Sequence, residues 1–214
     1  MGEDTTIALF PASVMSVMSK SPGLSAEEWT TILERIAVHL KKPASLCLIG
    51  SAPGILSGQP SRLSIDLDSW QKASKFAYSD LKQACEKAGV MFNPKGELKP
   101  DTPYLQIVEE GVVQIGKFKA VTTLMEEGKL TVTRPPIENI IASKLVRMEP
   151  KDLDDIAYLM QHYRTPKNAV GKVVEGFPAF ARERAEENLV YLDVFVEGLS
   201  KPAKTPRKKR GRPS

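Results

Sequence analysis

The segment 62–68, Arg-Leu-Ser-Ile-Asp-Leu-Asp, alternates between apolar and polar residues and so limits the folds open to this chain. In an extended strand, Ser64, Asp66 and Asp68 fall on one face and the apolar residues from Leu63 onward fall on the other. Asp is depleted in strands because its side chain competes for nearby backbone groups. Carboxylates roughly 6.5–7 Å apart along a strand can turn toward one divalent cation. The pattern predicts either a metal-binding strand face or the solvent face of an edge strand.

The remaining hydrophobic pattern predicts an α/β (α+β) fold, with a mixed sheet of four or five strands flanked by helices and a helical C-terminal part. Ser25 is the expected N-cap of the first helix. Gly and Pro mark several of the expected boundaries. The expected strands are 44–49, 62–68, 104–108, 111–119 and 129–133, and the expected helices are 25–40, 52–56, 71–88, 135–147, 150–163 and a helical stretch to 199 that breaks near 176–178.

These elements divide the chain into four parts. We predict an N-terminal helical segment over 1–43, a core over 44–133, a helical region over 134–200 and a disordered basic tail over 201–214. The tail carries seven Lys or Arg residues and no acid, which leaves the other 200 residues with 23 basic and 26 acidic side chains. The charge pattern therefore favours nucleic-acid contact by the tail over contact by the whole body.

Composition restricts the metals and compartments to consider. The chain has 214 residues, of which 42% are apolar and 26% charged, and no apolar run reaches the ~18 residues needed to span a bilayer. We expect a cytoplasmic protein with no membrane partner. Cys47 and Cys85 lack metal-ligand spacing, and His39 and His162 are isolated. Any bound metal is therefore expected to have oxygen ligands.

A second feature precedes the Asp-bearing strand. Gly50 and Ser51 follow an apolar strand and precede a short helix, so they predict a turn at which backbone and hydroxyl groups approach a phosphate. Arg62, at the entrance of the next strand, can reach a phosphate or pair with an aspartate. Asp66 and Asp68 would then hold Mg²⁺ beside that phosphate. A plain strand-ending turn is the competing interpretation of Gly50.

Together, Leu-Ile-Gly-Ser at 48–51 and Arg-Leu-Ser-Ile-Asp-Leu-Asp at 62–68 resemble the signature of the nucleotidyltransferase (polymerase-beta-like) superfamily. The nearer resemblance is to small bacterial nucleotidyltransferases related to the AbiEii and MenT toxins. Ile-Ile-Ala-Ser-Lys-Leu at 140–145 and Lys-Asp-Leu-Asp-Asp-Ile at 151–156 are similar to that group's downstream motifs. The resemblance covers about residues 44–163.

The resemblance implies a nucleotidyltransferase fold and roles for individual residues. Catalysis would involve Asp66, Asp68 and Asp152, with Asp66 and Asp68 as the Mg²⁺ ligands. The nucleotide triphosphate would be bound by Gly50, Ser51, Arg62, Ser64 and Lys144. It further implies transfer of a nucleotidyl group from an NTP to RNA, with tRNA a candidate, or to a protein hydroxyl, in a toxin–antitoxin or phage-defence setting with an antitoxin as partner.

Several of these residues have simpler interpretations. Lys144 falls within an apolar helix face, so it must extend to solvent or find an anion, which need not be a triphosphate. Asp152 and Asp155 follow Pro150 in the first turns of a helix, where acids favour the helix dipole.

The match also lacks one element of the superfamily pattern. Many members place a third carboxylate on a later strand, and the expected strand 111–119 has none. A second hypothesis therefore keeps the fold without catalysis, as a DNA-binding or regulatory protein with a degenerate nucleotide site.

The tail has a motif of its own. Arg210-Gly211-Arg212-Pro213, flanked by lysines, resembles the core of an AT-hook, in which extended Arg-Gly-Arg-Pro lies in a narrow A·T minor groove. The other interpretation is a solvated basic end with general, salt-sensitive attraction to phosphates. Binding of A·T-rich DNA is accordingly expected of the tail.

Overall fold

The computed structural model describes residues 23–200, except for the side chains of residues 196–200. The N-terminal residues 1–22 and the AT-hook-like tail therefore lie outside the described part. One six-stranded mixed sheet and eight α-helices make up the described chain, so the α/β class is confirmed and the expected four or five strands are too few. The helices are α1 (Ala26–His39), α2 (Ala52–Leu56), α3 (Tyr78–Lys87), α4 (Ile137–Arg147), α5 (Pro150–Tyr163), α6 (Lys167–Glu175), α7 (Ala179–Asn188) and α8 (Tyr191–Ser200).

The strands are β1 (Ala44–Ile49), β2 (Asp66–Trp70), β3 (Met91–Phe92), β4 (Tyr104–Val108), β5 (Thr122–Glu127) and β6 (Leu130–Arg134). Their order in the sheet is β3-β4-β2-β1-β6-β5. The central strand β1 runs antiparallel to β2 and parallel to β6, and β2 runs parallel to β4. Because β1 and β2 are neighbours, the turn that ends β1 lies beside the aspartates of β2.

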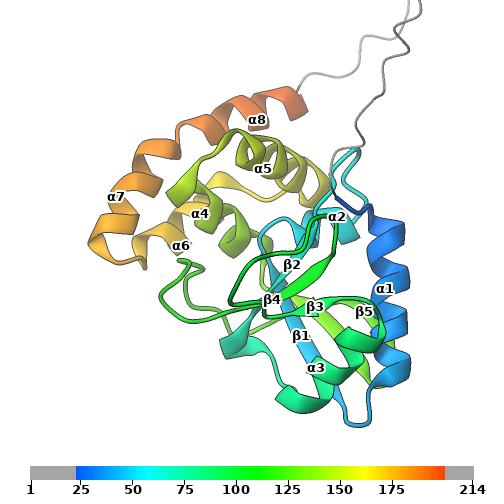
Figure 1. Cartoon of the computed structure of the whole chain (residues 1–214). Coiled ribbons are helices and arrows are strands. Elements are labelled where there is room, and N and C mark those ends of the chain that lie inside the picture. Colours follow the sequence, from blue (N-terminus) through cyan, green and yellow to red (C-terminus); the bar gives the residue numbers. More distant parts are fainter. Residues whose placement is uncertain (1–22, 201–214) are drawn as a thin grey trace, which may run out of the picture.

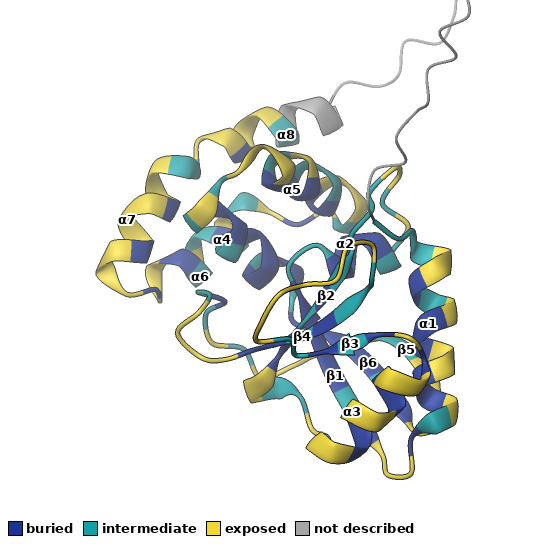
Figure 2. Ribbon diagram, in the orientation of Figure 1, coloured by how far each residue is buried: buried dark blue, intermediate teal, exposed yellow. Residues whose placement is uncertain are grey.

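Two groups of helices surround the sheet (Figure 1). Helices α1 and α3 pack together and close the largest core with residues from five of the strands. The chain begins α1 with a capping box, in which the side chains of Ser25 and Glu28 each accept a backbone N–H of the other, as the N-cap prediction requires. Buried residues of α4–α7 and Leu192 of α8 form a second core, visible as the dark inner faces of these helices in Figure 2.

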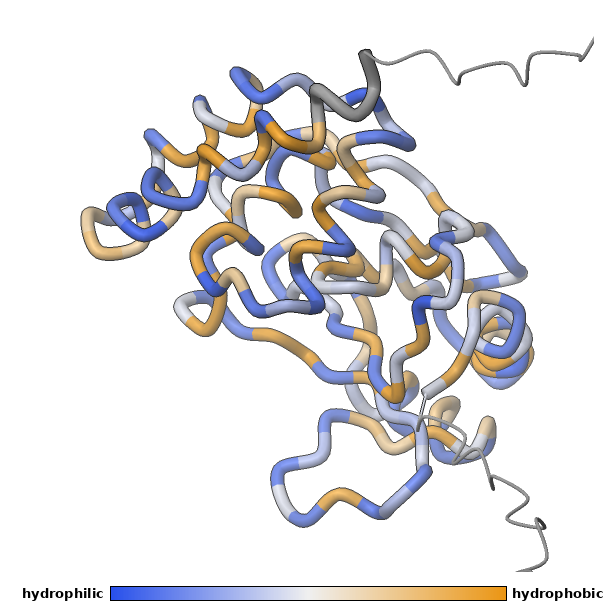
Figure 3. Tube along the Cα trace, turned by 90° about the horizontal axis from the view of Figure 1, so that it is seen from above, coloured by the Kyte–Doolittle hydropathy of each residue, from blue (hydrophilic) through white to orange (hydrophobic). Residues whose placement is uncertain are grey.

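Hydrophobic and hydrophilic positions alternate along these C-terminal helices (Figure 3). Helix α4 contacts α5, α6 and α7, so it is the central helix of this group. Its own first turn follows β6 directly, after two prolines that cannot extend the strand. The sheet and the helical group therefore meet where α4 and α5 approach the ends of β1 and β2. Among the described residues, no helix combines the length and apolarity required to cross a bilayer.

The predicted strand 62–68 begins later than expected. Regular pairing of β2 starts at Asp66 and continues to Trp70. Ser64 makes only an isolated bridge with Leu24, and its carbonyl accepts the indole N–H of Trp29 at 2.9 Å. The approach to the strand is thus held by the start of α1 rather than by the sheet.

The predicted strand 111–119 is wrong, and so is the continuous helix 71–88. Gly111 and Gly116 adopt positive φ angles of 94° and 72° in an irregular loop, a conformation that interrupts an extended strand. The prediction also lacks both edge strands, β3 and β5, of which β5 forms a hairpin with β6. In the other segment a short 3₁₀ turn, Gln71–Ala73, is followed by an extended residue, Lys75, that pairs with Ser45, and α3 begins only at Tyr78.

Candidate functional site

A cleft of about 730 Å³ lies between the sheet and the C-terminal helices. Its wall is formed by the end of β1, by β2 and the segment that leads into it, by the loop after β4, and by helices α4, α5 and α7. This volume is within the range of small-molecule sites, ~300–1,000 Å³. Seven of the eight residues predicted for catalysis or nucleotide binding line it, namely Gly50, Ser51, Arg62, Ser64, Asp66, Asp68 and Lys144.

The two aspartates of β2 share one face of the strand, as predicted. The side chain between them, Leu67, is 1% exposed and packs in the core on the opposite face. Asp66 accepts hydrogen bonds from the hydroxyls of Ser64 and Tyr104, the latter at 3.2 Å. No ion pair to Asp66 or Asp68 is found in the described part of the chain. The carboxylates are therefore oriented in part by neutral donors and remain without a cation in direct contact.

Burial, followed by the charge of Asp66, raises the pKa of Asp68 to about 6 despite the opposing charges of Arg147, Lys144 and Lys151. A carboxylate with a raised pKa is one whose ionised form the protein stabilises less well than water does. A divalent cation held by both side chains would supply the missing charge. The face of β2 therefore has the electrostatic property of an incomplete cation site.

The Gly50–Ser51 turn is built against this face. Gly50 has a φ of +67°, and a Cβ placed there would lie 3.0 Å from Oδ2 of Asp68. A side chain at position 50 would therefore meet both backbone strain and the carboxylate. Ser51 is the N-cap residue of α2 and its side chain makes no capping hydrogen bond. The need for glycine at position 50 thus has a geometric cause in the protein itself, and the approach of this turn to a phosphate stays a prediction.

The anionic partners of Lys144 are two aspartates of the same chain. It is 4% exposed, and its Nζ lies 2.7 Å from Oδ2 of Asp155 and 3.1 Å from Oδ1 of Asp152. Helix α4 presents the lysine from its last turns, and α5 presents both acids from one helical face. Because Lys144 also lines the cleft, its ammonium group is fixed at the cleft wall rather than free to move.

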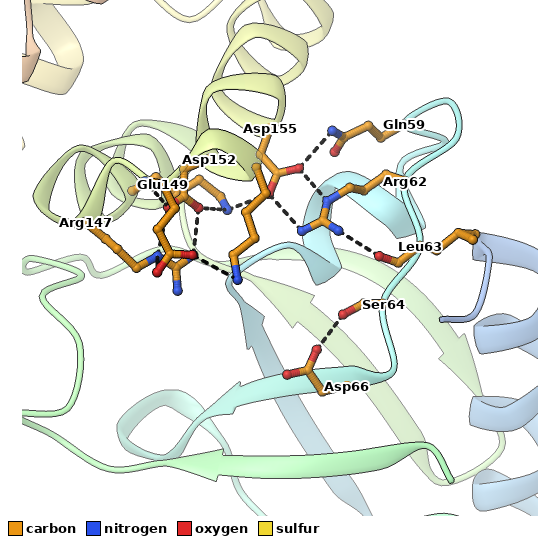
Figure 4. A network of polar contacts seen from close by, with 11 residues as sticks. Gln59, Arg62, Leu63, Ser64, Asp66, Arg147, Glu149, Asp152 and Asp155 are labelled. Carbon is orange, nitrogen blue, oxygen red and sulfur yellow. Dashed lines mark hydrogen bonds and ion pairs between the residues drawn. The ribbon is translucent and has the colours of Figure 1, made fainter. Parts of the chain in front are cut away.

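Asp152 does not reach the cleft. Its side chain is fully buried and is not part of the lining. Arg147 donates to both carboxylate oxygens, at 2.8 and 2.7 Å, and the backbone N–H of Glu149 donates at 3.1 Å (Figure 4). Burial acts to raise the pKa of Asp152, but these hydrogen bonds and the charge of Lys144 outweigh it and lower the pKa to about 2.

The placement of Asp152 therefore favours a positioning role over the predicted catalytic one. In this structure its carboxylate has no open path to a substrate in the cleft, because its partners occupy it on each side. It instead holds Arg147 and Lys144 at the edge of the cleft.

Arg62 pairs with an aspartate, one of the two alternatives that the sequence left open. Its Nε lies 2.9 Å from Oδ1 of Asp155, and its Nη1 donates to the carbonyl of Leu63 at 2.7 Å. Gln59 donates to the same oxygen of Asp155 at 2.9 Å. Burial acts to raise the pKa of Asp155, but Lys144 and Arg62 lower it. Arg62 thus lines the cleft while engaged with α5, which joins the approach to β2 to the C-terminal helices.

Three contributors to the site were absent from the sequence prediction. Tyr104 faces Asp66 from the neighbouring strand. The alternation of polar and apolar residues in Tyr-Leu-Gln-Ile-Val is the sequence signal that places Tyr104 on this face. Arg147 and Lys151 line the cleft beside Lys144. They flank the Met-Glu-Pro turn between two helices, and only the packing of α5 on α4 brings them to one wall. Burial, then the charge of Asp66, raises the pKa of Tyr104 to about 12, so the phenol remains a donor at neutral pH.

Asp66 and Asp68 suit a cation whose remaining ligands are waters or substrate oxygens. Within residues 23–200 no group of three or more His, Cys, Asp or Glu side chains is arranged to hold a metal ion. Mg²⁺ is commonly bound through one or two carboxylates, with waters and substrate phosphates completing its coordination. On the neighbouring strand, Gln106 is opposite Asp68, so no third carboxylate comes from β4.

Comparison with known proteins adds no relative. No family model, no curated protein and no solved structure matches the chain. The chemistry of the cleft is therefore the basis for assigning a function.

Proposed function

We propose that this protein is a Mg²⁺-dependent nucleotidyltransferase that binds an NTP in the cleft between the sheet and helices α4 and α5. The observation that carries the proposal is the convergence of two unlike groups on one cleft. An uncompensated pair of carboxylates, Asp66 and Asp68, lies within the same hollow as Lys144, Arg147 and Lys151. A metal–triphosphate complex has both a cation for the first group and anionic oxygens for the second.

Asp66 and Asp68 would hold the metal, and the Gly50–Ser51 turn would lie against the phosphates. When bound, Mg²⁺ would neutralise phosphate charge and orient the triphosphate for in-line displacement. Lys144 and Arg147, whose charges the acids of α5 already fix in place, would bind the triphosphate oxygens together with Lys151. This matters because charged groups that are already in position stabilise the transition state more than groups that must first reorganise.

In the proposed reaction, an acceptor hydroxyl oxygen bonds to the α-phosphorus while the bond from that phosphorus to the bridging oxygen breaks. Pyrophosphate is the leaving group, and it departs on the side of Lys144, Arg147 and Lys151. The acceptor's proton is assigned to the Asp66–Asp68 pair, because these are the carboxylates that line the described cleft. By the resemblance noted above, RNA, with tRNA first, is the acceptor to test, followed by a protein hydroxyl; the toxin–antitoxin or phage-defence setting and its antitoxin partner belong to the same proposal.

A transfer assay tests this function. The full chain is incubated with Mg²⁺, each α-labelled NTP in turn, and bulk RNA or protein as acceptor. We expect label transfer by the wild type and by Asp154→Ala, an exposed neighbour on α5, but not by Asp66→Ala/Asp68→Ala. Equal transfer by the double variant would contradict the assigned roles, and absence of both transfer and NTP binding in the wild type would contradict the function.

A second candidate is a DNA-binding or regulatory protein whose nucleotide site is catalytically degenerate. The observation that favours it is Gln106 opposite Asp68, which leaves the strand pair without a third carboxylate. NTP binding without transfer to any acceptor would support this candidate. Deletion of residues 201–214 tests its DNA contact; if the tail binds DNA, its removal lowers both the affinity and the salt dependence.

A further inference from the structure

Helix α7 places an aromatic side chain on the cleft that the core does not use. Phe180 lines the cleft and is 64% exposed, although a phenylalanine ring gains from burial. Three residues earlier, Phe177 is 5% exposed and belongs to the second core. The neighbouring Ala181 is also fully buried, so the contacts of α7 with the core do not depend on residue 180. An exposed ring at this position therefore calls for an explanation other than folding.

The apolar side chains at the cleft are unevenly distributed. Val112, in the loop after β4, is 71% exposed and lines the same cleft as Phe180. Both come from segments other than those that carry the charged groups: Asp66 and Asp68 lie on β2, and Lys144 and Arg147 on α4. The cleft thus combines a charged part with an exposed apolar part that is formed by residues of α7 and this loop.

We infer that Phe180 stacks on the nucleobase of the bound NTP, with Val112 as a second apolar contact. This inference rests on the proposed function and assigns the base end of the nucleotide to the α7 side of the cleft. A nucleotide has an anionic triphosphate at one end and a flat ring with apolar faces at the other, the same division that the cleft shows. Aromatic stacking tolerates any base because every base has a π-face.

A comparison of the affinities for ligands with and without a nucleobase distinguishes base stacking by Phe180 from a general packing role. The probes are α,β-methylene analogues of the four NTPs, which cannot transfer a nucleotidyl group, and ribose 5′-triphosphate, which lacks a base. Each is titrated with Mg²⁺ into the full chain. Phe180→Ala is expected to weaken binding of the analogues by about 10- to 100-fold. Binding of ribose 5′-triphosphate is expected to change by less than about two-fold, because the charged part of the cleft is untouched.

Two variants control for nonspecific effects. Phe180→Trp restores an aromatic face and is expected to bind the analogues at least as tightly as the wild type. Tyr191→Ala removes an aromatic residue of α8 that is comparably exposed and outside the cleft lining, and is expected to leave all affinities unchanged.

The outcomes separate this inference from the proposed function. If the analogues bind the wild type and Phe180→Ala equally, the stacking role is overturned while the NTP site stands. If Phe180→Ala raises only the KM of the acceptor in the transfer assay, the ring contacts the acceptor and the inference is likewise overturned. If the wild type binds neither the analogues nor ribose 5′-triphosphate, the proposed function fails and the stacking role fails with it.

Discussion

The pKa of Asp68 on β2 and the pKa values of the acid pair on α5 are shifted in opposite directions, although burial acts to raise all three. Asp152 and Asp155 on α5 are almost completely buried, at 0% and 1% exposure, yet the pKa values of both are lowered. Asp66 and Asp68 on β2 are more exposed, yet burial and mutual repulsion raise the pKa of Asp68 to about 6. The depth of burial therefore does not decide the protonation of these acids; the presence of cations in direct contact does.

This difference indicates that the α5 pair serves the structure, whereas the β2 pair is available for function. The α5 pair has its cations within the chain, from Lys144, Arg147 and Arg62, and so completes the packing of α5 against α4 and the approach to β2. In the β2 pair, Asp66 accepts hydrogen bonds from two hydroxyls and neither acid has such a cation among the described residues, which leaves the pair open to a cation from outside. The two pairs do not contact each other directly, so each can be mutated separately and the effects compared.

The largest effect is expected from breaking the α5 pair. Asp155→Ala leaves Lys144 with one partner fewer and removes the anchor of Arg62, and losing one member of a buried ion pair typically costs ~3–5 kcal/mol. Urea denaturation at pH 7.5 measures the free energy of unfolding. Asp154→Ala, at an exposed position one residue earlier, should change it by less than ~0.5 kcal/mol. Equal stability of the two variants would show that the α5 pair has no structural role.

The β2 pair should show the opposite sign. In the absence of divalent cations, Asp68→Asn removes a carboxylate whose charged form is disfavoured in the folded state. A pKa raised from 3.8 to about 6 corresponds to at most ~3 kcal/mol, so we expect the variant to be more stable than the wild type by ~1–3 kcal/mol at pH 7.5. Denaturation in EDTA checks this, and a loss of stability would contradict it.

The pH dependence should distinguish the two pairs. The folded protein binds the proton of Asp68 more tightly than the unfolded chain, so the stability from this group is present below about pH 4 and is lost as the pH rises toward 6. The pKa of Asp152 is lowered from 3.8 to about 2, so its contribution is present above about pH 4 and is lost as the pH falls. Asp68→Asn should therefore flatten the stability profile between pH 4 and 6, and a profile that keeps the wild-type slope would argue against the raised pKa.

The smallest effect is expected at the hydrogen bond that orients the β2 pair. Tyr104→Phe removes one of the two hydroxyl donors to Asp66 while keeping the ring. We expect a loss of about 1 kcal/mol in the binding of Mg²⁺ with an NTP analogue, equivalent to roughly five-fold in affinity. Calorimetric titration measures it, and an unchanged affinity would show that Ser64 orients the carboxylate without help from the tyrosine.

Local sequence signals gave those parts of the site that depend on one element. The alternation around Asp66 and Asp68 places both acids on one strand face, and Gly50 marks the turn beside them. For Lys144 within an apolar helix face the sequence left solvent or an anion as alternatives, and the structure shows anions. Contacts between elements were less accessible: nothing local shows that Asp152 turns toward Arg147 and Lys144 rather than toward the cleft.

The errors in the fold have the same origin. Residues 111–119 contain enough apolar side chains for a strand, but Gly116 has a positive φ, and a side chain there would collide with Val173 and Phe177. Residues 71–88 look helical, but Lys75 pairs with Ser45 across the sheet. In both places long-range packing overrides the local preference, and a single sequence does not display such packing.

Binding of Mg²⁺ together with an α,β-methylene NTP analogue tests most directly whether the β2 pair is the site that takes an external cation. Isothermal titration calorimetry at pH 7.5 would compare the wild type, Asp66→Asn/Asp68→Asn and the exposed α5 variant Asp154→Asn. We predict metal-dependent binding by the wild type and Asp154→Asn and its loss in the β2 double variant, which should remain folded. Binding of equal affinity by the folded double variant, or no metal-dependent binding by the wild type, would contradict the proposed role of Asp66 and Asp68.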